Sequence, residues 1–479
     1  MSVEHWMKNL DQNELNCECQ RWAFAHGKCV SFVQRCFALN DDSNVIPYPF
    51  TICPSPYPRN EYERACRIQS AINRLVYRLA FDIQMMDSVL EKFIDCDPFI
   101  KRLRQIYDHI QQLPYQSVAE TCIIRTDYML QELSRCAERT KLRLIEINTI
   151  AIGLGAAAKL MREWHKTFLT KIQSDFVSQL PENESHDLVI ESLLESWKIY
   201  GNPKAMILFV IPEREFNIGD QMLIEQGLLS RCDHSSLLIK HVTLIEISRC
   251  CSLNSKGILF FGKFEVALVY YRTAYDPKHF YNEDIWQAYI MLESSCAVKC
   301  PSLRYHLAGM KCFQLALTKE NFLKEVFKEE REFIDDVTDI TEEMFTIEQA
   351  MNDAVVQQRI LEHPESFYLK QSREGGGNVY CGGMLKERLN EIVEKNDSKR
   401  YFLMSRIFPP IRPSLICSNG SITEKQINSE LGIFGSLITQ NGKLVSERSG
   451  GYLLRSKPSS NIEGGIASGQ GFIDSIYLV

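Results

Sequence analysis

Hydrophobic residues recur at every third or fourth position between residues 68 and 93. We expect further helix through about 100–138, and an extended segment at 40–60, which contains five prolines. The spacing within 68–93 predicts one long amphipathic helix with an apolar stripe made of Ile68, Ile72, Leu75, Leu79, Ile83, Met86, Leu90 and Phe93.

Strands are predicted where short apolar runs end in polar residues. The run "LRLIEIN" at 142–148 indicates a buried strand, and "KAMILFVI" at 204–211 indicates a second one. A hairpin is expected at 257–272, with its turn at Gly262-Lys263.

The later part of the chain has a different pattern. Residues 318–362 are rich in charge and predicted to be helical, with "KEEREFIDD" on a solvated face. Residues 363–479 hold many glycines, between what we expect to be short strands. The fold class is therefore mixed α and β (α+β or mixed α/β), with more than one lobe. The 479-residue length agrees with several domains.

Composition and charge narrow the class of protein. With 45% hydrophobic and 24% charged residues, the chain is typical of a globular protein. A net charge of −7 without a long basic run argues against nucleic acid as the main partner. The N-terminal residues do not resemble a secretory signal, and the longest apolar run, 205–211, is too short to span a bilayer. We expect a soluble cytoplasmic protein with no membrane partner.

The 17 cysteines are scattered, and no C-x-x-C pair occurs among them. This spacing gives no support to a zinc-ribbon or thioredoxin-like site. We expect reduced thiols packed as small apolar groups.

A glycine-rich stretch, "SFYLKQSREGGGNVYCGGM" at 366–384, raises the first functional question. No Gly-Lys-Ser/Thr follows as in a P-loop, and the residues after the glycines make a poor helix start for a dinucleotide-binding turn. The pattern indicates a strand that leads into a flexible loop. Lys370 would reach an anion, the loop amides would cover it, and Glu374 would hold a divalent cation. The alternative is a surface turn with incidental charges.

Other strand ends carry groups that suit the same chemistry. Glu146 and Asn148 are two apart and so share one face of a strand. Joined by Glu374, they would suit Mg²⁺ held partly by nucleotide phosphates, although an ordinary strand end is the alternative. Four arginines would bind carboxylates or phosphates if they converge, and otherwise are surface charges: Arg125, Arg272, Arg373 and Arg455.

Taken together, these stretches resemble the eukaryotic-type glutathione synthetases, which have the ATP-grasp fold. The resemblance runs in order along nearly the whole chain, and each stretch alone is weak. Its stretches are "YPFTICPSPYPR" (48–59), "RTDYM" (125–129), "IEINTI" (145–150), "NIGDQ" (217–221), "YYRTAY" (270–275), "AVKCPSLRYHLAGMK" (297–311), "FYLKQSREGGGN" (367–378), "SELGIFG" (429–435), "LLRSK" (453–457), "EGGIASGQG" (463–471) and "DSIYLV" at 474–479.

The resemblance implies a ligase that joins γ-glutamylcysteine to glycine and cleaves ATP to ADP and phosphate through an acyl phosphate. It implies Mg²⁺, two ions per site, ATP as co-substrate and a homodimer. The implied organisation is an N-terminal helical region with part of the core at 1–203, an inserted α/β substrate-binding lobe at 204–311, and core at 312–479. The last part includes glycine-rich lid loops at about 365–420 and a C-terminal glycine-rich acceptor loop.

The resemblance implies a role for each residue that matches a family motif. The implied metal ligands are Glu146, Asn148 and Glu374. The implied catalytic arginines, which would neutralise the transferred phosphoryl group and substrate carboxylates, are Arg125, Arg373 and Arg455. The implied ATP-binding residues are Glu146, Lys311, Lys370, Glu374, Gly375, Gly376, Gly377, Asn378, Tyr380, Met404, Ser405, Arg406, Ile407, Glu430, Lys457 and Glu463. The implied substrate-binding residues are Arg125, Ile150, Ala151, Gly153, Glu215, Asn217, Gln221, Arg272, Tyr275, Arg455, Ile466 and Ala467.

The chain departs from the family pattern mainly near the substrate and lid. Ala151 and Gly153 stand where the family usually has serines, and Phe216 replaces a common arginine. The loop after the glycine triplet is one residue shorter, Gly382-Gly383 replaces an acidic pair, and Ser405 replaces an acid. Three hypotheses stay open: a glutathione synthetase, a related ligase with another donor or acceptor, and a nucleotide- or partner-binding protein without catalysis.

Overall fold

The computed structural model describes part of the N-terminal region (15–19, 21–22 and 31–33) and residues 45–479 except 134–138, 216, 233–236, 329, 372–378, 396, 419, 463 and 467–468. Its largest element is a 13-stranded mixed sheet. Ten of its strands lie in the order β17-β3-β20-β19-β18-β5-β12-β11-β10-β9, while β6 pairs with β5, and β7 lies between β11 and β8. The strand bounds are β3 (Phe50–Thr51), β5 (Glu120–Glu132), β6 (Thr140–Asn148), β7 (Met206–Ile211), β8 (Ile239–Thr243), β9 (Cys251–Leu253), β10 (Leu259–Phe261), β11 (Phe264–Tyr271), β12 (Val298–Cys300), β17 (Arg412–Ser418), β18 (Ser421–Gln440), β19 (Lys443–Pro458) and β20 (Phe472–Asp474).

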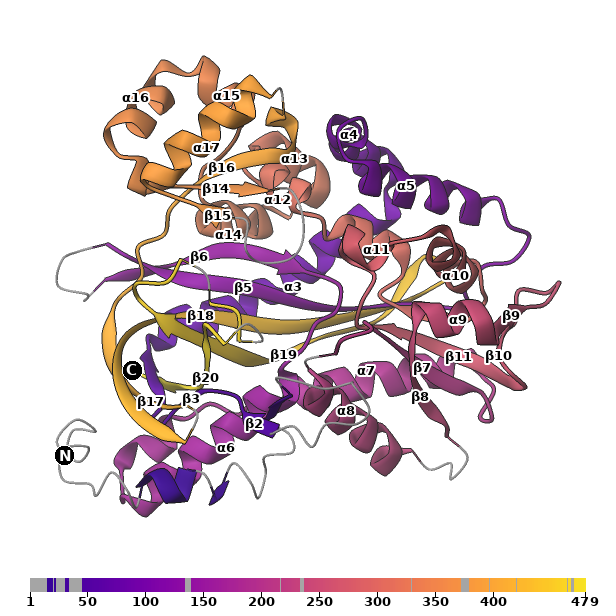
Figure 1. Cartoon of the computed structure of the whole chain (residues 1–479), viewed down its shortest axis with the longest axis horizontal. Helices are drawn as coiled ribbons and strands as arrows, with labels where there is room; N and C mark the ends of the chain where they lie inside the picture. The colour runs from indigo at the N-terminus through magenta and orange to yellow at the C-terminus, as the bar shows by residue number, and fades with distance from the viewer. Residues whose placement is uncertain are drawn as a thin grey trace.

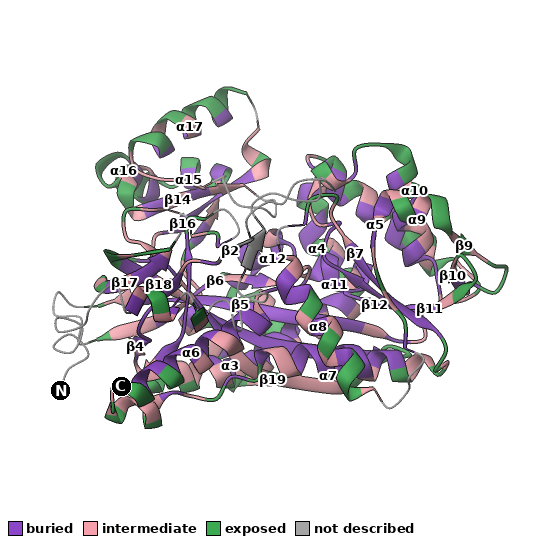
Figure 2. Ribbon diagram, turned by 60° about the horizontal axis from the view of Figure 1, so that its bottom comes forward, coloured by how far each residue is buried: buried purple, intermediate pink, exposed green. Residues whose placement is uncertain are grey.

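Both faces of the central strands are covered. Side chains alternate between the faces of a strand. Ile124 and Tyr128 of β5 pack with α3 in one hydrophobic cluster, whereas Ile123 of β5 packs with α7 in another. Figure 2 shows the central strands coloured as buried. The helices before the upper lobe are α3 (Arg59–Phe81), α4 (Ile83–Ile94), α5 (Pro98–Gln111), α6 (Gly155–Lys171), α7 (Ser185–Tyr200), α8 (Ile218–Arg231), α9 (Leu244–Cys250), α10 (Glu283–Glu293), α11 (Leu303–Ala308), α12 (Lys311–Leu317), α13 (Glu320–Phe327) and α14 (Arg331–Ile340).

A second, four-stranded sheet forms the upper lobe of Figure 1, in the order β13-β16-β14-β15. Its own apolar cluster includes Phe367, Leu369 and Leu403, separate from the clusters of the large sheet. The elements of this lobe are β13 (Met344–Thr346), α15 (Ile347–Asn352), α16 (Ala354–Glu362), β14 (Phe367–Gln371), β15 (Val379–Tyr380), α17 (Gly383–Glu394) and β16 (Tyr401–Ser405). Two small pairings complete the fold: β1 (Ser31–Val33) with β2 (Val45–Pro47), and β4 (Ser55–Tyr57) with β21 (Ile476–Leu478).

Several sequence predictions are confirmed. The strands predicted at 142–148 and 204–211 are β6 and β7. The hairpin is the antiparallel pair β10 and β11, and Gly262 adopts a positive φ of 57° in its turn. The mixed class is confirmed as well, and 318–362 is helical apart from the short β13. The domain boundaries at 203 and 311 stay predictions.

The single long helix predicted over the apolar stripe is wrong. The chain breaks at Asp82, between α3 and α4, where the residue is extended and its carboxylate accepts a hydrogen bond from the Met85 amide at 3.0 Å. An aspartate in this position caps a new helix. Ile83, the stripe residue beside the break, is 37% exposed.

Helix through 100–138 is also wrong, because α5 ends at Gln111 and 120–132 forms β5. β5 pairs with β6 on one side and with β18 on the other, and its residues 121–130 are buried. A strand buried on both faces has a nearly continuous run of apolar residues. The spacing of apolar residues alone does not distinguish such a run from a buried helix.

The short strands predicted after residue 363 are wrong for β18 and β19, which have 20 and 16 residues. Glycine weakens a strand interior, so frequent glycines favour short strands in a prediction from sequence. Here Gly435 lets α3 approach the sheet, since a Cβ at that position would lie 2.2 Å from the Asn73 side-chain oxygen. The glycine marks close packing inside the strand, not its end.

Candidate active site

Three neighbouring strands bring the predicted charged residues together. In the antiparallel register, Asp127 of β5 lies opposite Glu146 of β6 and opposite Gly432 of β18. Arg125, two residues earlier on the same face, lies opposite Asn148. The arrangement places both predicted metal ligands of β6 beside one predicted catalytic arginine.

Asp127 is the centre of this group, and it is fully buried. Its carboxylate accepts two hydrogen bonds from Arg125, from Nε and Nη2, both at 2.7 Å. Asn148 Nδ2 and Arg455 Nη2 each donate to Oδ2 at 2.9 Å. Arg455, on β19, also forms an ion pair with Glu430 of β18. One buried carboxylate therefore orients two arginines and an asparagine.

The close approach of the strands depends on Gly432. A Cβ added there would lie 2.7 Å from Asp127 Oδ1 and 2.8 Å from Arg125 Cδ. These distances are too short for any side chain, so glycine leaves the room that the charged pair occupies. The stretch "SELGIFG" thus contributes space to the site as well as Glu430.

Glu146 is the acid whose ionised form the nearby lysines and arginines stabilise. Burial opposes its ionisation, but Lys311, Arg455, Lys370 and Arg125 outweigh this effect and lower its pKa to about 2. Lys311 Nζ is 3.8 Å from Glu146 Oε2. By contrast, burial together with Asp127 and Glu146 raises the pKa of Glu430 against the pull of Arg455. Glu146 is thus ionised at neutral pH and available to a cation.

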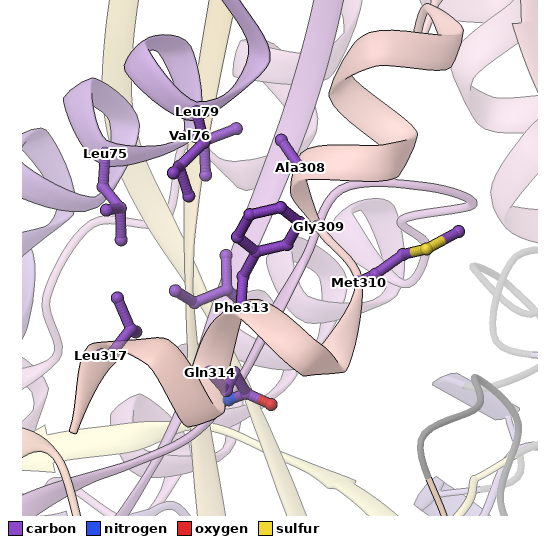
Figure 3. A pocket seen from close by; sticks show the side chains of 10 residues that line it. Leu75, Val76, Leu79, Ala308, Gly309, Met310, Phe313, Gln314 and Leu317 are labelled. Atoms are coloured by element: carbon purple, nitrogen blue, oxygen red, sulfur yellow. The ribbon is translucent and has the colours of Figure 1, made fainter. Parts of the chain in front are cut away.

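Lys311 begins α12, and an apolar contact holds that helix in place. Figure 3 shows Leu75, Val76 and Leu79 of α3 facing Phe313 and other side chains of α12 across a small cavity. The Gln314 side chain donates to the Ile145 carbonyl of β6 at 3.0 Å. The packing ties the lysine-bearing helix to the strand that carries Glu146.

The residues predicted to border the nucleotide lie on the smaller sheet. Lys370 of β14 lies opposite Phe402 of β16, and its Nζ is 3.4 Å from Met404 Sδ. Met404 and Ile407 are buried. Ser405, where the family has an acid, donates its amide to the Glu343 carbonyl at 2.9 Å and its hydroxyl to the Glu343 carboxylate at 3.2 Å.

Three further predicted residues lie at the edges of this region. The amide of Arg406 donates to the Ser366 carbonyl at 2.8 Å. Tyr380 lies on β15 opposite Leu369, with the Arg388 guanidinium 5.6 Å from its ring centroid. Lys457 of β19 donates to the Ile462 carbonyl.

A second group of predicted residues surrounds the loop after β6. The Glu215 carboxylate accepts hydrogen bonds from the Asn217 amide at 2.6 Å and from Gln221 Nε2 at 2.5 Å. Arg272, at the end of β11, is 7% exposed and donates from Nη1 to the Ile152 carbonyl. These contacts hold an acid and a cation in one small region.

The loop itself is held by Asp220 of α8, which accepts from the amides of Leu154 at 2.9 Å and Ala156 at 3.0 Å. Two non-glycine residues in it have left-handed backbone conformations, Ala151 with φ 54° and Leu154 with φ 69°. Such conformations cost free energy and persist only where the surroundings fix them. Asp220 supplies part of that fixing.

The C-terminal glycine loop is described in part. The amides of Gln470 and Gly471 both donate to the Gly465 carbonyl at 3.1 Å, and Ile466 is buried. A Cβ on Gly464 would lie 2.8 Å from Lys457 Cδ, so this glycine makes room for the lysine. The loop folds back against β19, the strand of Arg455.

Some predicted residues lie outside or beside these groups. Tyr275 follows β11, and its ring packs against His279 with centroids 4.8 Å apart. Ile150 is partly buried beside the main cluster. The predicted residues outside the described part of the chain are Phe216, Arg373, Glu374, Gly375, Gly376, Gly377, Asn378, Glu463 and Ala467.

Glu146 and Asn148 fit the demands of Mg²⁺. Asn148 Nδ2 points to Asp127 Oδ2 and to Glu146 Oε1, at 2.9 and 3.3 Å, so the amide oxygen faces the other way. An ionised carboxylate and an amide oxygen are hard ligands of the kind Mg²⁺ prefers. Among the described residues there is no cluster of three or more His, Cys, Asp or Glu suited to a metal.

Comparison with known proteins shows the family of the chain. The family model described as "Eukaryotic glutathione synthase, ATP binding domain" matches residues 9–478. The chain belongs to the eukaryotic glutathione synthase family. A chloroplastic glutathione synthetase of Solanum lycopersicum is 33% identical over 442 residues, which cover 91% of this chain and 78% of that protein. The glutathione synthetase of Homo sapiens is 32% identical over 483 residues, 99% of each chain.

A solved structure agrees at the level of the fold. A glutathione synthetase-like effector from Globodera pallida, in its apo form, superposes with a TM-score of 0.77 at 20% identity, over 98% of each chain. The ATP-grasp architecture predicted from the sequence is confirmed. In the described part of the chain, no helix is long and apolar enough to cross a membrane.

Sequence reasoning missed two acids of this glutathione synthase fold. Asp127 stood inside the quoted "RTDYM", and its position two residues after Arg125 was a usable signal. Asp220 stood inside "NIGDQ", but nothing in the sequence pairs it with amides 64 and 66 residues earlier. Cys300, expected to be a buried structural thiol, is 1% exposed, and burial raises its pKa to about 12.

Proposed function

We propose that this chain joins γ-glutamylcysteine to glycine at the expense of ATP, giving glutathione, ADP and phosphate. The observation that carries the proposal is the group of Arg125, Arg455 and Asn148 around buried Asp127, with Glu146 and Lys311 beside it. Such a group neutralises anions without supplying a nucleophile. Its chemistry suits phosphoryl transfer between bound substrates, in which the protein positions reactants and stabilises charge.

The reaction proceeds in two steps. The cysteinyl carboxylate oxygen attacks the γ-phosphorus, the bond to the bridging oxygen breaks, and ADP leaves. The amine of glycine then attacks the acyl phosphate carbon and, with loss of a proton, releases phosphate. Arg125 and Lys370 stabilise the phosphoryl group, and Arg455 binds the carboxylate of glycine. Within the described part of the chain, the nitrogens of Arg125 and Arg455 not bound to Asp127 or Glu430 have no hydrogen bond, which leaves them for these anions.

Mg²⁺ is part of the proposal. Glu146 and Asn148 would hold it, joined by Glu374, and the ion would neutralise charge on the ATP phosphates. The support is the depressed pKa of Glu146 and the outward amide oxygen of Asn148. Chelation by EDTA should abolish phosphate release, and added Mg²⁺ should restore it.

The test is phosphate release by the purified protein with Mg-ATP and γ-glutamylcysteine, with glycine, alanine, β-alanine or serine as acceptor. Release with glycine alone supports the proposal. Release with another acceptor contradicts it. The absence of phosphate release with every acceptor, from protein that binds ATP, also contradicts it. The variant Glu146→Gln should remove most of the activity, and Glu332→Gln, at an exposed position of α14, serves as the matched control that should leave it unchanged.

A homodimer and a cytoplasmic location belong to the same proposal. Sedimentation equilibrium would test the first, and a monomer would contradict it. The plant relatives carry "chloroplastic" in their names. Cell fractionation therefore has to test the cytoplasmic location.

A further inference from the structure

A helical segment near the N-terminus, residues 15–19, lies against the turn between β17 and β18. The side-chain amide of Asn16 donates to the Gly420 carbonyl in that turn at 2.6 Å. Cys19 follows Asn16 by three residues, and side chains with this spacing lie on one face of a helix. The Cys19 side chain is therefore directed toward the same pair of strands.

Contacts with α6 also hold this part of the chain. The Glu18 carboxylate forms an ion pair with Lys171, near the C-terminal end of α6. The Trp22 ring packs on the buried Trp164 ring of the same helix, with centroids 5.2 Å apart. The position of segment 15–19 is thus set by two elements of the core, α6 and the turn between β17 and β18.

These contacts bring two cysteines together that are far apart in the sequence. Cys19 is fully buried, Cys417 of β17 is 5% exposed, and both belong to one apolar cluster. Their side chains share a hydrogen bond, and both sulfurs are thiols in the structure. β17 is fixed between β3 and β18, so Cys417 is presented from a rigid strand. A covalent bond needs only a closer approach of sulfurs that already interact.

The two thiols differ in how readily they ionise. The hydrogen bond from Cys19 lowers the pKa of Cys417 against the effect of burial, whereas the same bond together with burial raises the pKa of Cys19. A third thiol of the cluster, Cys53, has its pKa raised by burial and by Asp474. The thiolate is the nucleophile of disulfide exchange, so Cys417 is the thiol suited to react first and Cys19 the one suited to resolve.

We propose that Cys19 and Cys417 form a disulfide when the protein meets a small disulfide as oxidant, and that this bond attaches the N-terminal segment covalently to β17. The Cys417 thiolate attacks one sulfur of the oxidant, its S–S bond breaks, and one half leaves as a thiolate that takes up a proton. Cys19, after losing its proton, attacks the Cys417 sulfur of the mixed disulfide and releases the other half as a second thiol. The two cysteines lose two electrons and two protons, which appear in the two small thiols.

The bond closes a loop from residue 19 to residue 417, most of the chain. A disulfide stabilises a fold chiefly by restricting the unfolded chain, and more so for longer loops. Oxidation should therefore raise the melting temperature. Because both sulfurs are buried, exchange requires local opening of segment 15–19 and should be slower than at Cys17, which is exposed in the same segment.

The experiment equilibrates the full chain in glutathione buffers that range from reduced to oxidised. Acid quenching, alkylation and tryptic digestion without reduction then map the linked peptides. Trypsin places Cys417 alone in peptide 407–425 and both Cys17 and Cys19 in peptide 9–21. The variants Cys19→Ala and Cys417→Ala remove the proposed partners, and the matched control Cys17→Ala removes the exposed thiol of the same peptide.

Peptides 9–21 and 407–425 should be linked in oxidised wild type and in Cys17→Ala, and not in Cys19→Ala or Cys417→Ala. The melting temperature should rise on oxidation by at least about 3 °C in wild type and Cys17→Ala and stay unchanged in Cys417→Ala. The peptide map of wild type needs no variant to fold.

Four results would overturn the proposal in whole or in part. The absence of any link in the most oxidising buffer, although Cys17 carries glutathione, overturns it. A link that persists in Cys19→Ala and disappears in Cys17→Ala assigns the bond to the exposed thiol instead. A link from 9–21 to peptide 36–59, which contains Cys53, overturns the assignment to Cys417. The expected link without a rise in melting temperature overturns the stabilising role.

Discussion

Replacing Asp127 by asparagine tests the centre of the site. The change keeps the volume and one carbonyl oxygen but removes the charge that binds Arg125, Arg455 and Asn148 through four hydrogen bonds of 2.7–2.9 Å. Asp127 is fully buried, so water does not replace the lost charge. Breaking a buried ion pair on one side costs about 3–5 kcal/mol. The free energy of unfolding should fall by about that amount.

Catalysis should fall too, because both arginines lose their common anchor. Displacement of a positioning group by about 1 Å costs about 10²-fold in rate, and we expect a loss of kcat of that order. Urea denaturation gives the stability, and phosphate release with glycine gives kcat. Thermal shift with ADP should separate unfolding from loss of turnover, since folded variant still binds nucleotide.

The chain offers a matched control in Asp87, which accepts a two-bond contact from Arg104 at 2.7 and 2.8 Å. The geometry equals that of Arg125 with Asp127, but the Asp87 side chain is 31% exposed. Asp87→Asn should therefore cost about 0–1 kcal/mol and leave kcat unchanged. The reasoning is refuted if Asp127→Asn resembles Asp87→Asn in both measurements. A loss of stability with normal kcat would make Asp127 structural only.

Two further predictions concern the close packing at Gly432 and the buried His306. Gly432→Ala should lower the free energy of unfolding by about 1–3 kcal/mol and reduce kcat, because the added methyl group lies 2.7 Å from Asp127 Oδ1. The control Gly383→Ala, where a Cβ would have nothing within 4 Å, should change neither quantity. Equal urea midpoints for the two variants would contradict this prediction. Burial lowers the pKa of His306 from 6.5 to about 4, so the unfolded chain binds a proton that the folded chain does not, and stability should fall as pH drops through this window. His306→Gln should reduce that fall by about 3 kcal/mol, measured by urea titration at both ends of the window, and an unchanged slope would contradict the assignment.

The sequence predicted elements whose signal is local. The alternation and turn of β10 and β11 and the apolar run of β7 are complete within a few residues. β5 was not recognisable because it is buried on both faces, by α3 and α7, and its partner strand β18 comes about 300 residues later in the chain. The break at Asp82 was hidden by an apolar stripe that continues across it. Here the capping side chain of Asp82 starts a new helix although the helical spacing of apolar residues continues.

The same limit applies to the site. Arg125, Glu146, Asn148 and Arg455 were singled out at strand ends and given roles by the resemblance, and the structure brings them together. Asp127 was overlooked although it stands two residues after Arg125, because its second arginine, Arg455, comes close to it only through the pairing of β5, β18 and β19.

Gly153 shows how the structure changes the meaning of a substitution. By sequence, the change from serine to glycine removes a hydroxyl from the donor site, worth about 1 kcal/mol. In the fold, the space next to Gly153 holds Arg272 Nη2 and Asn217 Nδ2, and no hydroxyl would fit beside them. Tyr48 fixes one of these donors from below. The glycine therefore leaves room for two nitrogen donors, and the lost hydroxyl is not by itself evidence of a weakened enzyme.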